Sequence, residues 1–173
     1  AAQDIPEAMV HGPQAKPNFD PNFVAPVYFP PPLPAGGTGS FEAIQNTGWT
    51  PPDPDLAVGP NHIVAVANGE ISFFDKLGNQ TFADTIAGSG GFWGSVGAGG
   101  FVFDPVALFD PHTNRFIVAA ADGAGSNDAI VLAMSDDDDP NGTWYKYRFP
   151  VSSTCVFLDF PNLGVNDQTI FMA

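Results

Sequence analysis

Four consecutive aspartates in the segment SDDDDPNGTW (residues 135–144) are the part of this sequence best suited to binding a cation. Asp137, Asp139 and Asn141 stand at alternating positions, and Gly142 follows them. Oxygen ligands at positions 1, 3 and 5 with glycine at position 6 are typical of the first half of a calcium loop. The spacing predicts a metal site with Asp137, Asp139 and Asn141 as ligands and calcium as the cofactor.

The same segment has a simpler interpretation as a solvated hairpin turn. The twelfth position, where a bidentate Glu normally completes a calcium loop, is Arg148. Asp, Asn and Gly are also the residues that turns prefer for backbone reasons. A turn without a metal therefore stays open as the alternative.

Aspartates also recur beside prolines in other parts of the chain. Asp53, Asp55, Asp104 and Asp159 each lie at or near a proline that precedes an apolar run. Such a set could ring one face of the protein and supply paired carboxylates for acid–base chemistry. An Asp beside Pro at the start of a strand can instead accept backbone N–H bonds. We expect the structural role, and the sequence assigns no catalytic residue.

The glycine-rich segment AGSGGFWGSVGAGG (residues 87–100) is a second candidate site. No lysine follows it, which excludes a phosphate-binding P-loop. Phe92 and Trp93 could contact a sugar or a partner chain, but we expect them to hold the loop on the core. His62 and His112 each fall in a predicted turn between two strands, but at different positions within that turn. We therefore expect both histidines to be turn residues rather than metal ligands.

Charge and composition exclude some classes of partner. The chain of 173 residues has 5 Lys+Arg against 19 Asp+Glu, a formal net charge of −14, which disfavours nucleic acid and anionic membranes. The 19 glycines and 18 prolines favour turns and extended chain over helix. Cys155 is the only cysteine, so no disulfide can form within the chain, and its apolar neighbours predict a buried thiol.

The location of the protein is indicated by two features. No apolar run approaches the roughly 18–20 residues that a membrane-spanning helix needs. The first residues, AAQDIPEAM, suit a terminus left by cleavage after a small-residue motif. We expect a secreted or periplasmic protein that does not span a membrane.

Residues 1–48 predict an extended, proline-rich N-terminal arm. Prolines recur every few residues up to PVYFPPPLP, which favours polyproline II. The arm also carries apolar side chains, namely Phe19, Phe23, Val27, Tyr28, Phe29 and Leu33. Because these are too many for a solvated linker, we expect the arm to pack on its own domain or on a neighbouring chain.

Residues 49–173 predict a chain of short β-strands. The runs HIVAVAN, ISFFDK, RFIVAAA, AIVLAMS, WYKYRF and TIFMA are each bounded by Gly, Pro, Asn or Asp, and none has a helical stripe. DKLGN between ISFF and QTF predicts a hairpin turn. The fold class expected is all-β.

A repeat led by proline organises these strands. Pro54, Pro105 and Pro161 are each followed by apolar residues, a polar turn and an apolar strand, at spacings of 51 and 56 residues. A four-stranded propeller blade has a period of about 40–50 residues. The repeat predicts a partial β-propeller of about two to three blades, incomplete at its C-terminal end, because TIFMA ends inside a strand of the third blade.

Three segments of the chain carry a family resemblance: GWTPPDPDLAVGPNHIVAVANGEISFFDKLGN, VFDPVALFDPHTNRFIVAA and AMSDDDDPNGTWYKYRF. Over roughly residues 48–173 the chain resembles secreted bacterial β-propeller repeat proteins. SDDDDPNGTW also resembles a loosened Asp-box, the S-x-D-x-G-x-T-W turn of sialidase-like propellers, although its aspartate-to-glycine spacing departs from that motif. The resemblance implies an exported propeller that binds or scaffolds.

Three functions follow as hypotheses. The first is a non-catalytic extracytoplasmic scaffold or binding module that contacts other protein chains, or missing blades of the same protein, through its arm and blade edges. The second is a fragment of a sialidase-like or other carbohydrate-active enzyme, with carbohydrate as its ligand. Sialidase chemistry uses a cluster of arginines, and the sequence contains only two, Arg115 and Arg148, which disfavours this hypothesis. The third is a structural subunit of a larger assembly held together by strand addition.

Overall fold

The structure is a computed structural model that describes residues 40–123, 128–151 and 158–173. The chain divides into two units, residues 1–37 and residues 38–173, and the described residues all belong to the second. Cys155 and the apolar side chains between Phe19 and Leu33 lie outside the described residues. The predictions of a buried thiol and of a packed arm therefore stay predictions.

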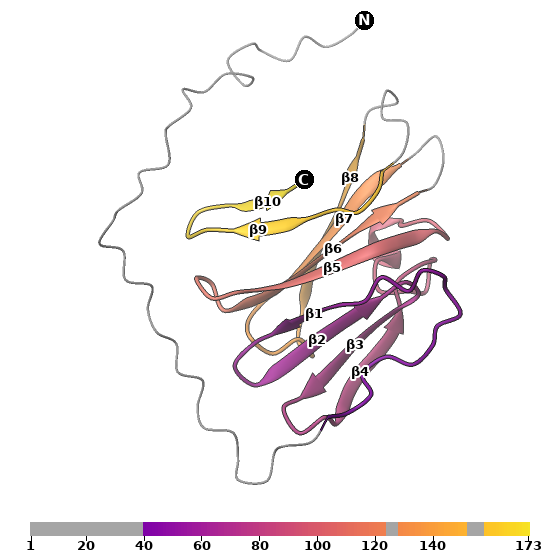
Figure 1. Ribbon diagram of the computed structural model, residues 1–173. Helices are drawn as coiled ribbons and strands as arrows, with labels where there is room; N and C mark the ends of the chain where they lie inside the picture. The colour runs from indigo at the N-terminus through magenta and orange to yellow at the C-terminus, as the bar shows by residue number, and fades with distance from the viewer. Residues whose placement is uncertain (1–39, 124–127, 152–157) are drawn as a thin grey trace, which may run out of the picture. The chain divides into compact units, whose positions relative to one another are not determined.

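Two antiparallel sheets of four strands form the larger part of the described chain (Figure 1). In each sheet the strands follow one another in sequence order, so every connection is a hairpin. The first sheet contains β1 (Asp55–Val58), β2 (His62–Ala67), β3 (Glu70–Asp75) and β4 (Gln80–Thr85). The second contains β5 (Val102–Asp110), β6 (Arg115–Asp122), β7 (Ala129–Ser135) and β8 (Trp144–Pro150).

A third, two-stranded antiparallel sheet follows the second. It consists of β9 (Leu163–Val165) and β10 (Ile170–Met172). Among the described residues the only helical element is one short 3-10 turn, η2 (Gly94–Val96), in the connection between the first two sheets. The prediction of an all-β fold is confirmed, and no sheet in the described part closes on itself.

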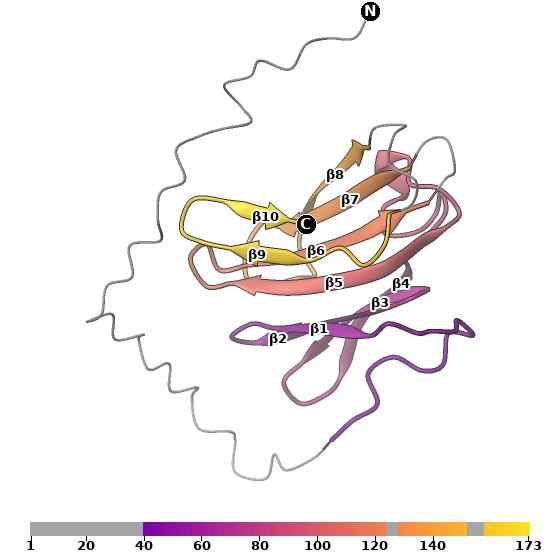
Figure 2. The ribbon, with the colours of Figure 1, turned by 45° about the horizontal axis from the view of Figure 1, so that its top comes forward.

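Two hydrophobic clusters join the three sheets face to face, in the order seen in Figure 2. The first cluster lies between the first and second sheets and includes Val64, Ile71, Phe73, Phe116, Val118 and Val131. The second lies between the second and third sheets and includes Ile117, Ala119, Leu132, Leu163, Val165, Ile170 and Met172. β6 is buried on both faces as a result, which explains why its sequence is a continuous apolar run.

The three prolines of the predicted repeat lie at or near the start of corresponding strands, one in each sheet. Pro54 comes directly before β1, Pro105 lies within the first half of β5, and Pro161 lies two residues before β9. The residue before each proline has positive φ: 41° at Asp53, 50° at Asp104 and 50° at Phe160. Positive φ is uncommon outside glycine, so the shared conformation marks three equivalent chain positions.

Residues at the N-terminal side of β1 cover part of the outer face of the first sheet. The ring of Phe41 packs on Phe74 with centroids 5.2 Å apart, and the Thr47 hydroxyl donates to the Asn68 carbonyl at 2.6 Å. Leu56 and Val58 on β1 are still 55 % and 51 % exposed. The first sheet therefore keeps an open strip of apolar surface along β1.

No helix in the described ranges is long and apolar enough to cross a membrane.

Candidate functional site

The predicted calcium ligands lie together in the turn between β7 and β8. One carboxylate oxygen of Asp137 accepts the backbone N–H of Asp139 at 2.8 Å. One oxygen of Asp139 accepts both the backbone and the side-chain N–H of Asn141, at 3.0 and 2.8 Å. The backbone N–H of Asn141 is the main cause that lowers the pKa of Asp139, followed by its side-chain N–H. These oxygens stabilise the turn itself.

Neighbouring residues attach this acidic turn to the sheet. The Ser135 hydroxyl accepts the backbone N–H of Phe116 at 2.8 Å and donates to the carbonyl of Asp137 at 2.6 Å. Asp136 accepts the backbone N–H of Thr143 at 3.1 Å. A Cβ on Gly142 would lie 2.9 Å from the Asp136 carboxylate, which explains the glycine.

Calcium binding at this turn stays a prediction. Over the ranges that the structure describes, no three His, Cys, Asp or Glu side chains converge as metal ligands would. The positive group that faces the turn when protonated is His62, whose Nε2 lies 3.7 Å from Asp139 and whose Nδ1 lies 3.4 Å from the Asp138 carbonyl. His62 is the first residue of β2 and so links the first sheet to the acidic turn of the second.

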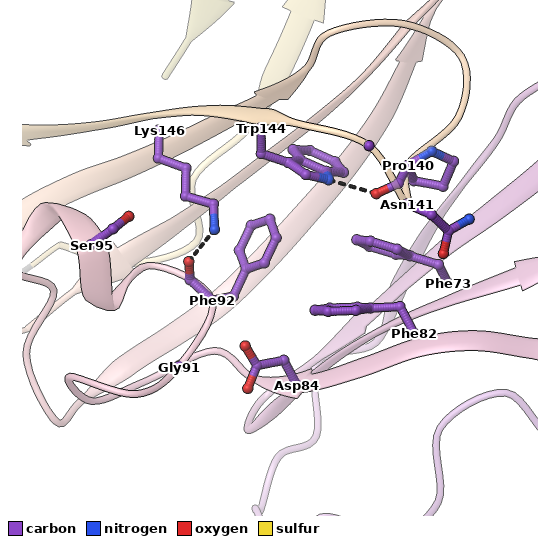
Figure 3. Close-up of a pocket in the computed structure, with 11 residues that line it drawn as sticks. Phe73, Phe82, Asp84, Gly91, Phe92, Ser95, Pro140, Asn141, Trp144 and Lys146 are labelled. Carbon is purple, nitrogen blue, oxygen red and sulfur yellow. Dashed lines mark hydrogen bonds between the residues drawn. The ribbon is translucent and has the colours of Figure 1, made fainter.

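A cavity of about 350 Å3 opens beside this turn, between the first and second sheets (Figure 3). Three segments line it: strands β3 and β4, the glycine-rich connection, and the turn with the start of β8. Its lining residues are Phe73, Phe82, Asp84, Gly91, Phe92, Ser95, Pro140, Asn141, Gly142, Trp144 and Lys146. Of the three predicted metal ligands, only Asn141 reaches this cavity.

Aromatic rings form its apolar wall. Phe73 is stacked between Phe82 and Trp144, with centroid distances of 4.6 and 5.6 Å. Phe92 stands edge-on to Trp144 at 5.2 Å. Phe92 and Trp93 are 4 % and 0 % exposed, which confirms that they hold the glycine-rich loop on the core.

Two charged side chains reach the same cavity from opposite sheets. The Lys146 ammonium donates to the Phe92 carbonyl at 2.5 Å and lies 3.9 Å from the centroid of the Phe92 ring. Burial lowers the pKa of Lys146, and the nearby carboxylate of Asp84 partly offsets this lowering. Asp84 uses one oxygen to accept the backbone N–H of Thr85 at 2.8 Å.

The sequence interpretation missed Asp84, Lys146 and the aromatic stack. The alternation of WYKYRF places Trp144, Lys146 and Arg148 on one face of β8, and that face packs toward the first sheet. The signal was therefore present for β8. Its partner wall comes from β3 and β4, more than 50 residues earlier in the chain, and the sequence does not reveal that these segments meet.

The repeated aspartates connect one sheet to the next. Asp55 accepts the backbone N–H of Ala107 at 3.0 Å, and Asp104 accepts that of Phe160 at 2.9 Å. The predicted structural role is confirmed for these two residues.

Asp53 accepts a different kind of hydrogen bond. Its carboxylate accepts from the Asn68 side chain at 2.8 Å, and the Asn68 amide oxygen accepts the backbone N–H of Asp104 at 2.8 Å. Burial raises the pKa of Asp53, and the Asp104 carboxyl raises it further. Asp159 adds a smaller increase to the same pKa.

Comparisons with protein-family models, with curated proteins and with solved structures found no match to this chain. The structure itself defines an all-β protein of three stacked antiparallel sheets.

Proposed function

We propose that this chain is a non-catalytic β-propeller scaffold or binding module that acts by protein–protein contact. Three observations support the propeller part of the proposal. The two larger sheets are four-stranded meanders, their first strands β1 and β5 lie against each other, and β5 also contacts β9. Four-stranded sheets stacked around their first strands are typical of propeller blades. The extracytoplasmic location expected from the sequence belongs to the same proposal.

The observation that carries the binding function is an exposed aromatic row on β8. Tyr145, Tyr147 and Phe149 are 46 %, 46 % and 44 % exposed. Tyr147 pairs with Leu132 on β7, and Leu132 pairs with Ala119 on β6. Since cross-strand partners share a face, the aromatic row lies on the face that β9 and β10 pack against.

The third sheet covers only the part of that face that β5, β6 and β7 form. Its side chains pack against Val106, Leu108, Ile117, Ala119 and Leu132, together with Met134, while the row on β8 stays open. An exposed apolar patch of this kind indicates an interaction surface. For the isolated chain we propose a second copy as the occupant, with its own open sheet face packed on the row.

The expected affinity follows from the exposed area. Three aromatic side chains of about 150–250 Å2 each, a little under half exposed, offer roughly 200–350 Å2. At about 25 cal/mol per Å2 their burial contributes roughly 5–8 kcal/mol. Association costs about 4 kcal/mol or more, which leaves at most about 4 kcal/mol, so self-association through the row should be weak, with a Kd of about 1 mM or higher.

Sedimentation velocity between about 10 µM and about 3 mM tests this proposal, because the upper end of that range exceeds a Kd of about 1 mM. We expect species heavier than the 18.2 kDa monomer to grow with concentration. The triple variant Tyr145→Thr, Tyr147→Thr, Phe149→Thr keeps β-forming residues and should shift the chain to monomer. Leu77→Thr, at a residue 74 % exposed in the β3–β4 turn, is the control. A compact monomer at every concentration would contradict the proposal.

A further inference from the structure

The cavity between β4 and β8 has the dimensions of a small-ligand site. Its volume of about 350 Å3 is near the lower end of the roughly 300–1,000 Å3 range typical of such sites. It is distinct from the aromatic row on β8, because Trp144 and Lys146 alternate with Tyr145 and Tyr147 along that strand. We propose that this cavity binds one neutral pyranose ring of a saccharide.

The apolar wall is rigid before any ligand arrives. Phe73 is 1 % exposed and is held in the core between two stacked rings. The Trp144 indole N–H donates to the Pro140 carbonyl at 2.7 Å, which fixes the ring against the acidic turn. With that N–H occupied, Trp144 presents carbon surface to the cavity, as Figure 3 shows. Such a wall suits the C–H groups on one side of a sugar ring.

The rim carries hydrogen-bonding groups of both kinds. An ammonium has three donors, and one of those on Lys146 is used by the Phe92 carbonyl. One Asp84 oxygen accepts from Thr85, and its second oxygen has no hydrogen bond to any residue that the structure describes. Ser95 and Asn141 add a hydroxyl and an amide. Adjacent sugar hydroxyls can donate to Asp84 and accept from Lys146.

Other ligand classes fit this arrangement less well. A flat aromatic ligand could lie on the apolar wall, but it would leave the polar groups of Lys146 and Asp84 at the rim without new hydrogen bonds. A ligand cation would compete with Lys146, which lies over the Phe92 ring. An anion would meet Asp84 in a protein of formal net charge −14. A wholly apolar ligand would desolvate both charges without replacing their hydrogen bonds.

Ligand-observed NMR on the full chain tests the proposal. Saturation-transfer spectra would be recorded with the methyl pyranosides of glucose, galactose, mannose and N-acetylglucosamine, and with indole and tetramethylammonium as competing classes. We expect saturable binding of at least one pyranoside, with Kd near about 1 mM. Binding of none of the pyranosides, or of indole or tetramethylammonium alone, would overturn it.

Two variants place the binding in this cavity. Asp84→Asn keeps the oxygen that accepts from Thr85 but replaces the second oxygen with a donor, and Lys146→Met removes the ammonium. Each should weaken pyranoside binding about tenfold or more, because a hydrogen bond to a charged group is lost. Asp167→Asn, in the β9–β10 turn, is the matched control and should bind as the parent does. Melting curves establish that Asp84→Asn is folded, and unchanged binding by folded Asp84→Asn would overturn the assignment.

Discussion

The ion pair between Arg148 on β8 and Asp122 at the end of β6 offers a sharp test of how the second sheet is held together. The Arg148 Nε lies 2.7 Å from the Asp122 carboxylate, and the two side chains are 18 % and 0 % exposed. The other Asp122 oxygen accepts the backbone N–H of Gly99 at 3.0 Å. Replacing Arg148 with Met would leave a buried carboxylate without its counter-charge.

The expected loss of stability is large. Removing one partner of a buried ion pair costs about 3–5 kcal/mol, because the remaining charge is uncompensated. Arg148 keeps some contact with water, so we expect the lower part of that range. For a protein of this size about 1 kcal/mol corresponds to roughly 2–4 °C, and Arg148→Met should lower Tm by about 6–12 °C.

Urea unfolding followed by tryptophan fluorescence measures the free energy directly. Arg115→Met is the matched control, because Arg115 is a partly exposed arginine whose guanidinium lies 6.0 Å from the Tyr145 ring, a contact worth about 1 kcal/mol or less. The double variant Arg148→Met, Asp122→Asn removes both charges and should recover a large part of the loss. The ion pair does not stabilise the fold as argued if Arg148→Met lowers the free energy of unfolding no more than Arg115→Met does. The same conclusion follows if adding Asp122→Asn to Arg148→Met recovers none of the lost free energy.

Three further predictions concern the acidic groups. If Asp137, Asp139 and Asn141 bind calcium, chelation should lower Tm and Asp137→Ala should abolish that response; equal melting with chelator and with calcium leaves a metal-free turn. The pKa of Asp53 is raised above 3.8, so its stabilising contribution is full at low pH and is lost as pH rises through its folded-state pKa. Asp53→Asn should therefore raise Tm at pH 7 but not at pH 3, and a gain that is equal at both would contradict the argument. In Asp104→Gly the glycine tolerates the positive φ, but the carboxylate that accepts the backbone N–H of Phe160 is lost. Amide hydrogen exchange should therefore accelerate in β9 and β10 but not in β2 and β3, with Asp104→Asn as the control. Uniform acceleration in all four strands would instead mean a general loss of stability.

Several strands could be predicted from the sequence because each carries its own signal. HIVAVAN, ISFFDK, RFIVAAA and AIVLAMS become β2, β3, β6 and β7, and DKLGN forms the predicted hairpin turn, where Asp75 accepts the backbone N–H of Leu77 and of Asn79. Alternation and turn residues are local properties, so they can be recognised without knowledge of the fold.

The cavity could not be predicted because it depends on contacts between distant segments. Lys146 meets the carbonyl of Phe92, which is 54 residues earlier in the chain, and Trp144 meets Phe73. Phe82 and Asp84 alternate with exposed residues along β4, which identifies a half-buried strand but not its neighbour. Only the stacking of two sheets decides which side chains share a cavity.

The hydrogen bonds at the proline-led positions explain why that stacking has a fixed register. Asp55 reaches from the first sheet to Ala107 in the second, Asn68 reaches to Asp104, and Asp104 reaches to Phe160 before the third. Hydrophobic faces alone could slide past one another, since burial is non-directional, whereas a hydrogen bond requires its partner within about 3 Å. Because each of these bonds joins one particular residue of one sheet to one particular residue at the next, together they fix the register in which the sheets stack.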